Sequence, residues 1–191
     1  MLKKIIQKVF NLRKDVGLNY YLTGFIFKYI FRQNINVPWM VHHSSTVKIP
    51  ENITRGLDVY PGDSPNNYIE ALNGLIIGDF TNIGPNVGII TANYRLENNK
   101  SVVFTENPVK IGKFCWLGMN SIILPSVEIG DFTVVAAGAV VSKSFPEGYA
   151  VLAGNPARVI RQLNKNECEI IREEKYKSFT KGNKKHSAVI K

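Results

Sequence analysis

The sequence predicts a mainly β fold, a parallel β-helix whose triangular coils each consist of three six-residue repeats. The first observation is an aliphatic residue at every sixth position in two long blocks. These residues are Ile77, Ile83, Ile89, Ile111, Leu117, Ile123, Ile129, Val135 and Val141. The second observation is Gly or Ala directly after six of these nine residues. A fixed internal period of this kind is the sequence signature of a stacked-repeat architecture.

The chemistry of the repeat explains this geometry. The aliphatic residue points into the coil and stacks on the residue 18 positions away, as Ile111 does on Ile129. The fifth position of the repeat also faces the narrow interior, so it needs a small or β-branched side chain. Thr81, Val87, Cys115, Ser121, Val127, Thr133 and Ala139 occupy it. Coils contact only their neighbours, so stability accumulates along the stack and its ends need covering.

The period is weaker or lost in three places. Weaker repeats at Val47 and Ile53 predict that the stack begins near residue 45. Residues 62–73 are rich in turn-forming residues, and we expect an excursion from the stack there. Residues 93–108 form a second interruption, which predicts a loop that projects from the coil. Such loops on rigid scaffolds commonly carry function.

Helical patterns flank the repeats. Residues 1–32 carry apolar side chains at three- and four-residue intervals, which predicts two helical pieces divided by Gly17 and Gly24. They either cap one end of the stack or rest on a membrane surface. The cap is the preferred interpretation, and the basic residues that accompany the apolar face are the reason for the membrane alternative. These are Lys3, Lys4, Lys8, Arg13 and Lys14.

A short charged helix over residues 165–178 and a disordered polar tail are expected after the last coil. The predicted organisation is a helical cap over residues 1–40, a β-helix domain over residues 41–163, and a helix with its tail over residues 164–191.

Composition narrows the class of partner. The formal net charge of +9 suits phosphate-bearing ligands, nucleic acid or an anionic membrane surface. Nucleic acid is disfavoured, because the chain shows no RNA-binding signature, zinc-finger spacing or recognition-helix pattern. Two cysteines are typical of reduced thiols in a cytoplasmic protein. The apolar run over residues 20–31 is short and contains Lys28, so we expect no transmembrane helix.

The repeats, the segment FCWLGMNSIILPSVEIGDFTVVAAGAVVSKSFP and the terminal AGNPARVIR together resemble hexapeptide-repeat O-acetyltransferases. The similarity is to enzymes of the maltose and galactoside type and of exopolysaccharide biosynthesis, and covers about residues 40–163. The resemblance implies a left-handed parallel β-helix of hexapeptide coils with N-terminal helices and a short C-terminal helix. It also implies a homotrimer with active sites between subunits, acetyl-CoA as acyl donor, and a sugar or polysaccharide-precursor hydroxyl as acceptor.

The resemblance assigns cofactor contacts to seven residues. They are Trp116 and Met119 at the thioester end, Ala137 beside the pantetheine arm, Ser142 and Lys143 further along it, and Arg158 and Arg161 at the CoA phosphates. Arginine is a natural partner of phosphate groups. The alternatives are a solvated basic helix start for the two arginines and a plain packing role for Trp116.

The family places a catalytic His just ahead of the projecting loop, and this chain has Tyr94 there, followed by Arg95. A phenol titrates near 10 and an imidazole near 6.5, so at neutral pH only about one phenol in a thousand is ionised. Neither His42 nor His43 replaces the base by sequence position. Both precede the first coil and could reach a site only across a subunit interface, so a surface or capping role is the other interpretation.

Three functions follow for this site. The first is an O-acetyltransferase whose acceptor contacts Asp63 and Asn93, with the segments 62–73 and 94–107 shaping the pocket. The second is a catalytically silenced trimer that keeps CoA binding. The third is a metal-dependent hydratase of the same fold. It is disfavoured because such sites need three His in the coils and the repeats contain none. We therefore expect no metal.

Overall fold

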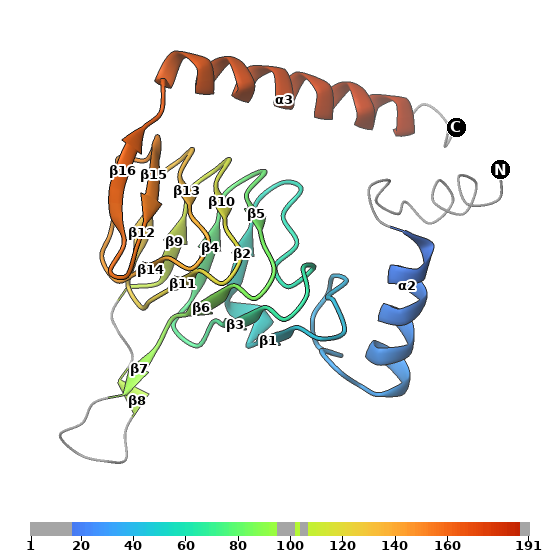
Figure 1. Ribbon diagram of the computed structural model, residues 1–191. Helices are drawn as coiled ribbons and strands as arrows, with labels where there is room; N and C mark the ends of the chain where they lie inside the picture. Colours follow the sequence, from blue (N-terminus) through green and yellow to red (C-terminus); the bar gives the residue numbers. More distant parts are fainter. Residues whose placement is uncertain (1–16, 95–101, 104–106, 188–191) are drawn as a thin grey trace.

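The computed structural model describes residues 17–94, 102–103 and 107–187, and these form a parallel β-helix of short strands (Figure 1). Its coils build three sheets, which we call A, B and C, and their strands run parallel except for the last strand of sheet C. Sheet A contains β1 (Thr46–Lys48), β3 (Tyr68–Glu70), β6 (Gly88–Ile90), β11 (Ile122–Ile123) and β14 (Val140–Val141). Sheet B contains β2 (Ile53–Arg55), β4 (Leu75–Ile77), β9 (Val109–Ile111) and β12 (Glu128–Ile129). Sheet C contains β5 (Asn82–Ile83), β10 (Trp116–Leu117), β13 (Val134–Val135), β15 (Ala150–Ala153) and β16 (Arg158–Gln162).

The predicted repeat register is confirmed. All nine aliphatic residues of the repeat are buried, with at most 5% of their surface exposed. Ile111 pairs with Ile129 and Leu117 with Val135, so the coils stack at the expected spacing. The seven residues at the fifth position of the repeat are buried as well. Small polar members of this set bond to coil backbone, as Thr81 does through its hydroxyl to the carbonyl of Gly112 at 2.7 Å.

The predicted excursion over residues 62–73 is wrong in its second half. Residues Tyr68–Glu70 form strand β3 inside sheet A, and Ile69 is fully buried between Val47 and Ile89. The residue pairs are 22 and 20 positions apart here instead of 18, which hides the strand from a search for a strict period. Two extra residues lie between sheets A and B in each of these two coils, because Val47 and Arg55, like Ile69 and Ile77, are eight positions apart instead of six. The first coil has two more between Arg55 and Ile69.

The N-terminal helix lies across the first coil, at the end of the stack opposite β15 (Figure 1). It consists of α2 (Leu18–Phe25) and a π-helical continuation, η1 (Ile26–Ile30). Gly24 does not break it, contrary to the prediction. The backbone stays helical there because Gly24 is buried against the chain at Met40, where an added Cβ would lie 2.4 Å from the Met40 side chain.

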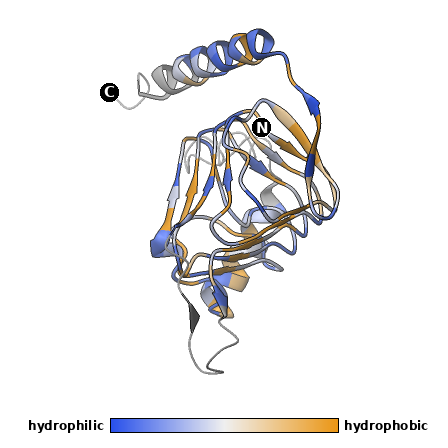
Figure 2. Ribbon diagram, turned by 90° about the vertical axis from the view of Figure 1, so that its left-hand side faces the viewer, coloured by the Kyte–Doolittle hydropathy of each residue, from blue (hydrophilic) through white to orange (hydrophobic). Residues whose placement is uncertain are grey.

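The C-terminal helix α3 (Lys165–Ser187) runs along the outside of the stack and ends nine residues later than predicted (Figure 1). Its ribbon is mostly hydrophilic (Figure 2). It covers a column of aromatic side chains at one corner of the coils. These are Phe80, Phe114, Phe132 and Tyr149, with successive ring centroids 4.8–5.5 Å apart.

Helix α3 is held on this column by aromatic and ionic contacts. Tyr176 and Phe179 place their rings 5.1 and 5.4 Å from Phe80. Arg172 donates a hydrogen bond of 2.8 Å to the carboxylate of Asp131. Within the residues that the structure describes, no helix is long and apolar enough to cross a membrane.

Candidate active site

Each coil turns three corners, which we name by the sheets that they join. The aromatic column and α3 occupy the B–C corner. The residues predicted to bind cofactor and acceptor lie elsewhere, at the C–A corner and the A–B corner, with Arg158 and Arg161 on sheet C. The structure therefore divides the predicted site into two groups, one on each side of sheet A.

The first group lies on sheet C and at the C–A corner. Trp116 faces outward from β10 and has 46% of its surface exposed, and Met119 in the following turn has 48% exposed. Ala137 lies at the same corner one coil further on, where the Gly138 N–H donates to the Met119 carbonyl at 2.9 Å. Gly118 allows this close approach, because an added Cβ would lie 2.7 Å from the amide nitrogen of Ala137.

The two arginines belong to the same group. Arg158 and Arg161 lie on the edge strand β16, which pairs antiparallel with β15, so the helix-start alternative is wrong. Residues three apart in a regular strand point to opposite faces. Here the register shifts, so that Arg158 pairs with Ala153 and Arg161 with Val151, and Ile160 is the extra residue of a β-bulge. The bulge places both arginines on the outer face of sheet C.

This outer face continues back to Trp116. Trp116 pairs with Val134, Val134 with Val151, and Val151 with Arg161. Neighbouring strands are about 4.8 Å apart, so the row from Trp116 to Arg161 spans about 14 Å along the stack. The Trp116 ring thus lies exposed at one end of this outward-facing row and two guanidinium groups lie at the other, whereas Val151 between them is buried.

The second group lies at the A–B corner. Ser142 and Lys143 follow β14 there and are exposed. Two coils earlier, the chain leaves the same corner after β6 as strand β7 (Asn93–Tyr94), which pairs antiparallel with β8 (Val102–Val103) and projects from the stack (Figure 1). Asn93 is exposed. Tyr94 pairs with Val102 through the backbone, whereas Arg95 lies outside the described residues.

Glu70 stabilises the backbone where the β7–β8 hairpin leaves the stack, a role that the sequence did not reveal. Its carboxylate accepts hydrogen bonds from the backbone N–H groups of Thr91 at 3.1 Å and Ala92 at 3.2 Å, and also from that of Leu72. The Asn73 N–H donates to the Thr91 hydroxyl oxygen at 2.9 Å. The coil below therefore fixes the backbone that leads into Asn93 and Tyr94.

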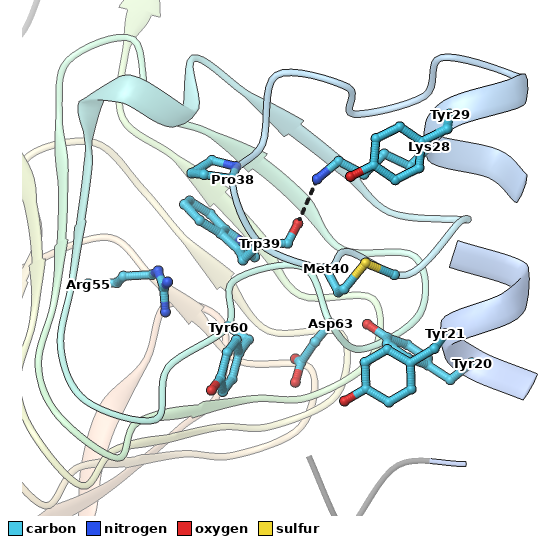
Figure 3. Close-up of a pocket in the computed structure, with 10 residues that line it drawn as sticks. All are labelled: Tyr20, Tyr21, Lys28, Tyr29, Pro38, Trp39, Met40, Arg55, Tyr60 and Asp63. Carbon is cyan, nitrogen blue, oxygen red and sulfur yellow. Dashed lines mark hydrogen bonds between the residues drawn. The ribbon is translucent and has the colours of Figure 1, made fainter. Parts of the chain in front are cut away.

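Asp63 and Asn93 lie at different corners, although both were predicted to contact the acceptor. Asp63 precedes the C–A corner of the first coil and lines a cavity of about 340 Å³ between the N-terminal helix and that coil (Figure 3). Aromatic rings from both elements line this cavity. Arg55 also lines it, and its guanidinium carbon lies 4.9 Å from the centroid of the Trp39 ring and 5.4 Å from that of the Tyr60 ring.

The two histidines before the first coil take part in packing. The Nδ1 atom of His42 lies 2.8 Å from the Ser44 hydroxyl, and its ring lies 4.2 Å from that of His43. The His43 ring stacks on Phe27 at 4.7 Å. Burial and the neighbouring His43 lower the pKa of His42, which favours its neutral form. Both residues connect the N-terminal helix to the stack, as the capping interpretation expected.

Neither cysteine is an activated nucleophile. Burial raises the pKa of the Cys115 thiol to about 12, and burial also raises the pKa of Cys168. A thiolate is the nucleophilic form of cysteine, so neither group is reactive at neutral pH. Among the residues that the structure describes, no three His, Cys, Asp or Glu side chains gather where they could hold a metal ion.

Comparison with known proteins defines the class. A model of the bacterial transferase hexapeptide family, described as six repeats, matches residues 108–143. The putative colanic acid biosynthesis acetyltransferase WcaF of Escherichia coli K12 is 34% identical over 135 residues, which are 70% of this chain and 71% of that protein. The chain therefore belongs to the hexapeptide-repeat acetyltransferase family, and its fold is the left-handed parallel β-helix.

Two further proteins show the range of the similarity. The putative acetyltransferase YJL218W of Saccharomyces cerevisiae is 39% identical over 118 residues, which are 59% of this chain and only 60% of that protein. A galactoside acetyltransferase solved in complex with coenzyme A superimposes with a TM-score of 0.58 and 26% identity, over 78% of this chain and 82% of that chain.

Proposed function

We propose that the protein is an acetyl-CoA-dependent O-acetyltransferase that acts in the cytoplasm on a hydroxyl of a sugar or polysaccharide precursor. In this proposal acetyl-CoA lies along the outer face of sheet C, with its thioester near Trp116 and its phosphates near Arg158 and Arg161. The observation that supports the proposal is the register that links an exposed aromatic ring, Trp116, to two exposed arginines on the outward face of sheet C. A galactoside acetyltransferase of similar structure binds coenzyme A.

The proposed active site lies between two copies of the chain. The groups at the C–A and A–B corners are separated by sheet A, so one chain does not bring them together. Both groups run in the same direction along the stack. Asp63 lies before Trp116 on one side, and Asn93 with Tyr94 lies before Ser142 on the other. If the C–A corner of one copy packs against the A–B corner of the next, the acceptor residues of both corners therefore come together at one end, and their cofactor residues come together at the other.

We propose that this contact closes into a ring of three copies. If each copy uses both corners that flank sheet A, that sheet faces the symmetry axis. One outward row of this sheet holds Thr46, Tyr68, Gly88, Ile122 and Val140 in register and is apolar beyond Thr46. The corresponding row of sheet B carries Lys110 and Glu128, which form an ion pair at 3.5 Å. An apolar row suits a buried interface, and α3 already covers the third corner.

The reaction requires a base near the acceptor. The hydroxyl oxygen attacks the thioester carbonyl, its proton passes to the base, and the C–S bond breaks to release CoA, which leaves as the thiol once protonated. Tyr94 occupies the family position of that base. The tyrosine at this position therefore supports a second candidate function, which is a silenced trimer that binds CoA without turnover. Calorimetric titration with CoA tests binding in both cases, and thiol release from acetyl-CoA with simple sugars distinguishes them.

We expect the double variant Arg158→Ala/Arg161→Ala to lose about 100-fold or more in affinity for CoA. Each charge-assisted contact with phosphate contributes about 1.5–3 kcal/mol, so two such contacts account for a loss of this size. The remaining affinity should depend less on salt than that of the unchanged protein, because fewer exposed charges are screened. Isothermal titration at two salt concentrations measures both effects.

The ligand control is a pantetheine fragment without phosphates, whose affinity should stay unchanged. The protein control is Lys177→Ala, which removes an exposed cation from α3 that pairs only locally with Glu173 at 2.9 Å. Equal losses for CoA and for the fragment would place the two arginines outside the phosphate site.

A further inference from the structure

The N-terminal helix exposes an apolar stripe. Its members recur at three- and four-residue intervals, so they share one face of the helix. They are Leu22, Phe25, Ile26, Tyr29 and Ile30, with between 43% and 66% of their surface exposed. Phe31 follows directly and is 66% exposed. Large exposed apolar patches are rare on proteins that bind nothing at that surface, so we expect a binding partner to cover this stripe.

The opposite face of the same helix already packs on the stack. Gly24 is buried against the chain at Met40, and Phe27 stacks on His43. Lys28 donates a hydrogen bond of 3.2 Å to the Trp39 carbonyl and another to that of Val37 (Figure 3). These contacts fix the rotation of the helix, so that most of the stripe faces away from the β-helix, while Tyr29 at its edge also lines the cavity beside the first coil.

The charge of the chain segment that contains the stripe points to its occupant. Residues 1–50 contain eight Lys and Arg but one acidic residue, Asp15, and so carry seven of the nine excess positive charges of the chain. Residues 16–50 contain no Asp or Glu at all. Apolar side chains on a helix within a strongly basic segment are the combination that binds anionic lipid surfaces. A contact between two copies of this segment would instead bring like charges together.

The length and placement of the helix fit a helix that lies on a membrane surface rather than one that crosses the bilayer. Eight α-helical and five π-helical residues extend about 20 Å, whereas the hydrocarbon core is about 30 Å thick. The helix lies across the end of the stack (Figure 1). In the proposed trimer, whose axis is parallel to the stacks, three such helices would share one end of the assembly. Three linked weak contacts bind a surface far more tightly than one.

We propose that the stripe from Leu22 to Ile30 docks the protein on an anionic lipid surface, with the helix lying in the plane of the interface. This site is separate from the proposed cofactor contacts, whereas Tyr29 at its edge lines the same cavity as the proposed acceptor contact Asp63. Docking would place the end of the stack that carries Asp63 at the membrane, and so would favour acceptors that are presented there.

Vesicle co-sedimentation tests the docking. We expect the full chain to bind vesicles of mixed phosphatidylglycerol and phosphatidylcholine, to bind pure phosphatidylcholine much more weakly, and to be released by salt. The variant Ile26→Ser/Ile30→Ser should lose binding by about tenfold to hundredfold, because two partly buried aliphatic side chains are removed from the interface. Its CoA affinity should be unchanged.

The matched control is Ile170→Ser/Ile171→Ser on α3. Both of these isoleucines are exposed to a similar degree, at 59% and 54%, and their loss should leave vesicle binding unchanged. Three results would overturn the proposal: no binding of the unchanged chain to anionic vesicles, equal losses in the two double variants, or a change of oligomeric state in Ile26→Ser/Ile30→Ser with vesicle binding intact. The last result would assign the stripe to a contact between copies.

Discussion

Replacing Tyr94 by His is expected to raise acetyl transfer to a cognate sugar by about 10²–10⁴-fold. General-base catalysis contributes a factor of this size, and an imidazole with a pKa near 6.5 takes up the hydroxyl proton at neutral pH far more readily than a phenol with a pKa near 10. The backbone at this position is fixed by β7 and by the Glu70 carboxylate below it, so the new side chain would start from a defined place. Thiol release from acetyl-CoA measures the effect.

Tyr94→Phe is the matched variant, because it removes only the hydroxyl. If the neutral phenol contributes little as a base, this variant should turn over at the rate of the unchanged protein. The opposite pattern, with Phe abolishing activity and His failing to restore it, would make the hydroxyl a participant. No turnover in any variant, with CoA still binding, would establish the silenced trimer. A His42→Ala variant tests whether the adjacent copy supplies a base instead.

The repeat made most of the fold predictable, because one period determines both burial and stacking. All nine aliphatic residues that the strict period selects are buried, and the pairing of Ile111 with Ile129 follows directly from it. The weaker repeat at Ile53 is only half-buried and pairs with Leu75. The same reliance on a strict period explains the error at Tyr68–Glu70. Inserted residues change the spacing without changing which side chain points inward, and Ile69 is as buried as the regular members.

The ends of the chain were less predictable because tertiary contacts decide them. Helix α3 continues beyond residue 178 because Phe179 packs on Phe80, which lies about a hundred residues earlier. Gly24 is typical of a helix break, yet it allows the helix to approach the chain at Met40. Neither contact can be read from local propensity.

Motif resemblance selected individual site residues but not their grouping. Counting repeats would have assigned Met119 and Ala137 to one corner and Ser142 to the next, so the signal for two groups was present in the sequence. The bulge at Ile160 was not foreseeable, because a regular strand would put Arg158 and Arg161 on opposite faces. The hydrogen bonds that Glu70 accepts from the next coil depend on two coils lying side by side, and no short sequence motif indicates that contact.

The variant Ile129→Asp is expected to lose about 4 kcal/mol or more of unfolding free energy. Ile129 is 1% exposed, pairs with Ile111 in sheet B and bridges to Phe145, so a carboxylate there would be buried without a partner. For a chain of this size such a loss lowers the melting temperature by on the order of 10 °C or more. Because each coil supports the next, the damage should spread along the stack, and thermal unfolding followed by circular dichroism measures it.

Ile76→Asp is the control for this variant, since it makes the same substitution in the same sheet at a side chain that points outward and is 41% exposed. Its melting temperature should change by only a few degrees, because a surface substitution alters unfolding free energy by about 0.5 kcal/mol. A stable Ile129→Asp protein beside a destabilised Ile76→Asp protein would mean that the inward and outward faces of sheet B are interchanged. That result would shift every repeat by one residue, because side chains alternate between the two faces of a strand.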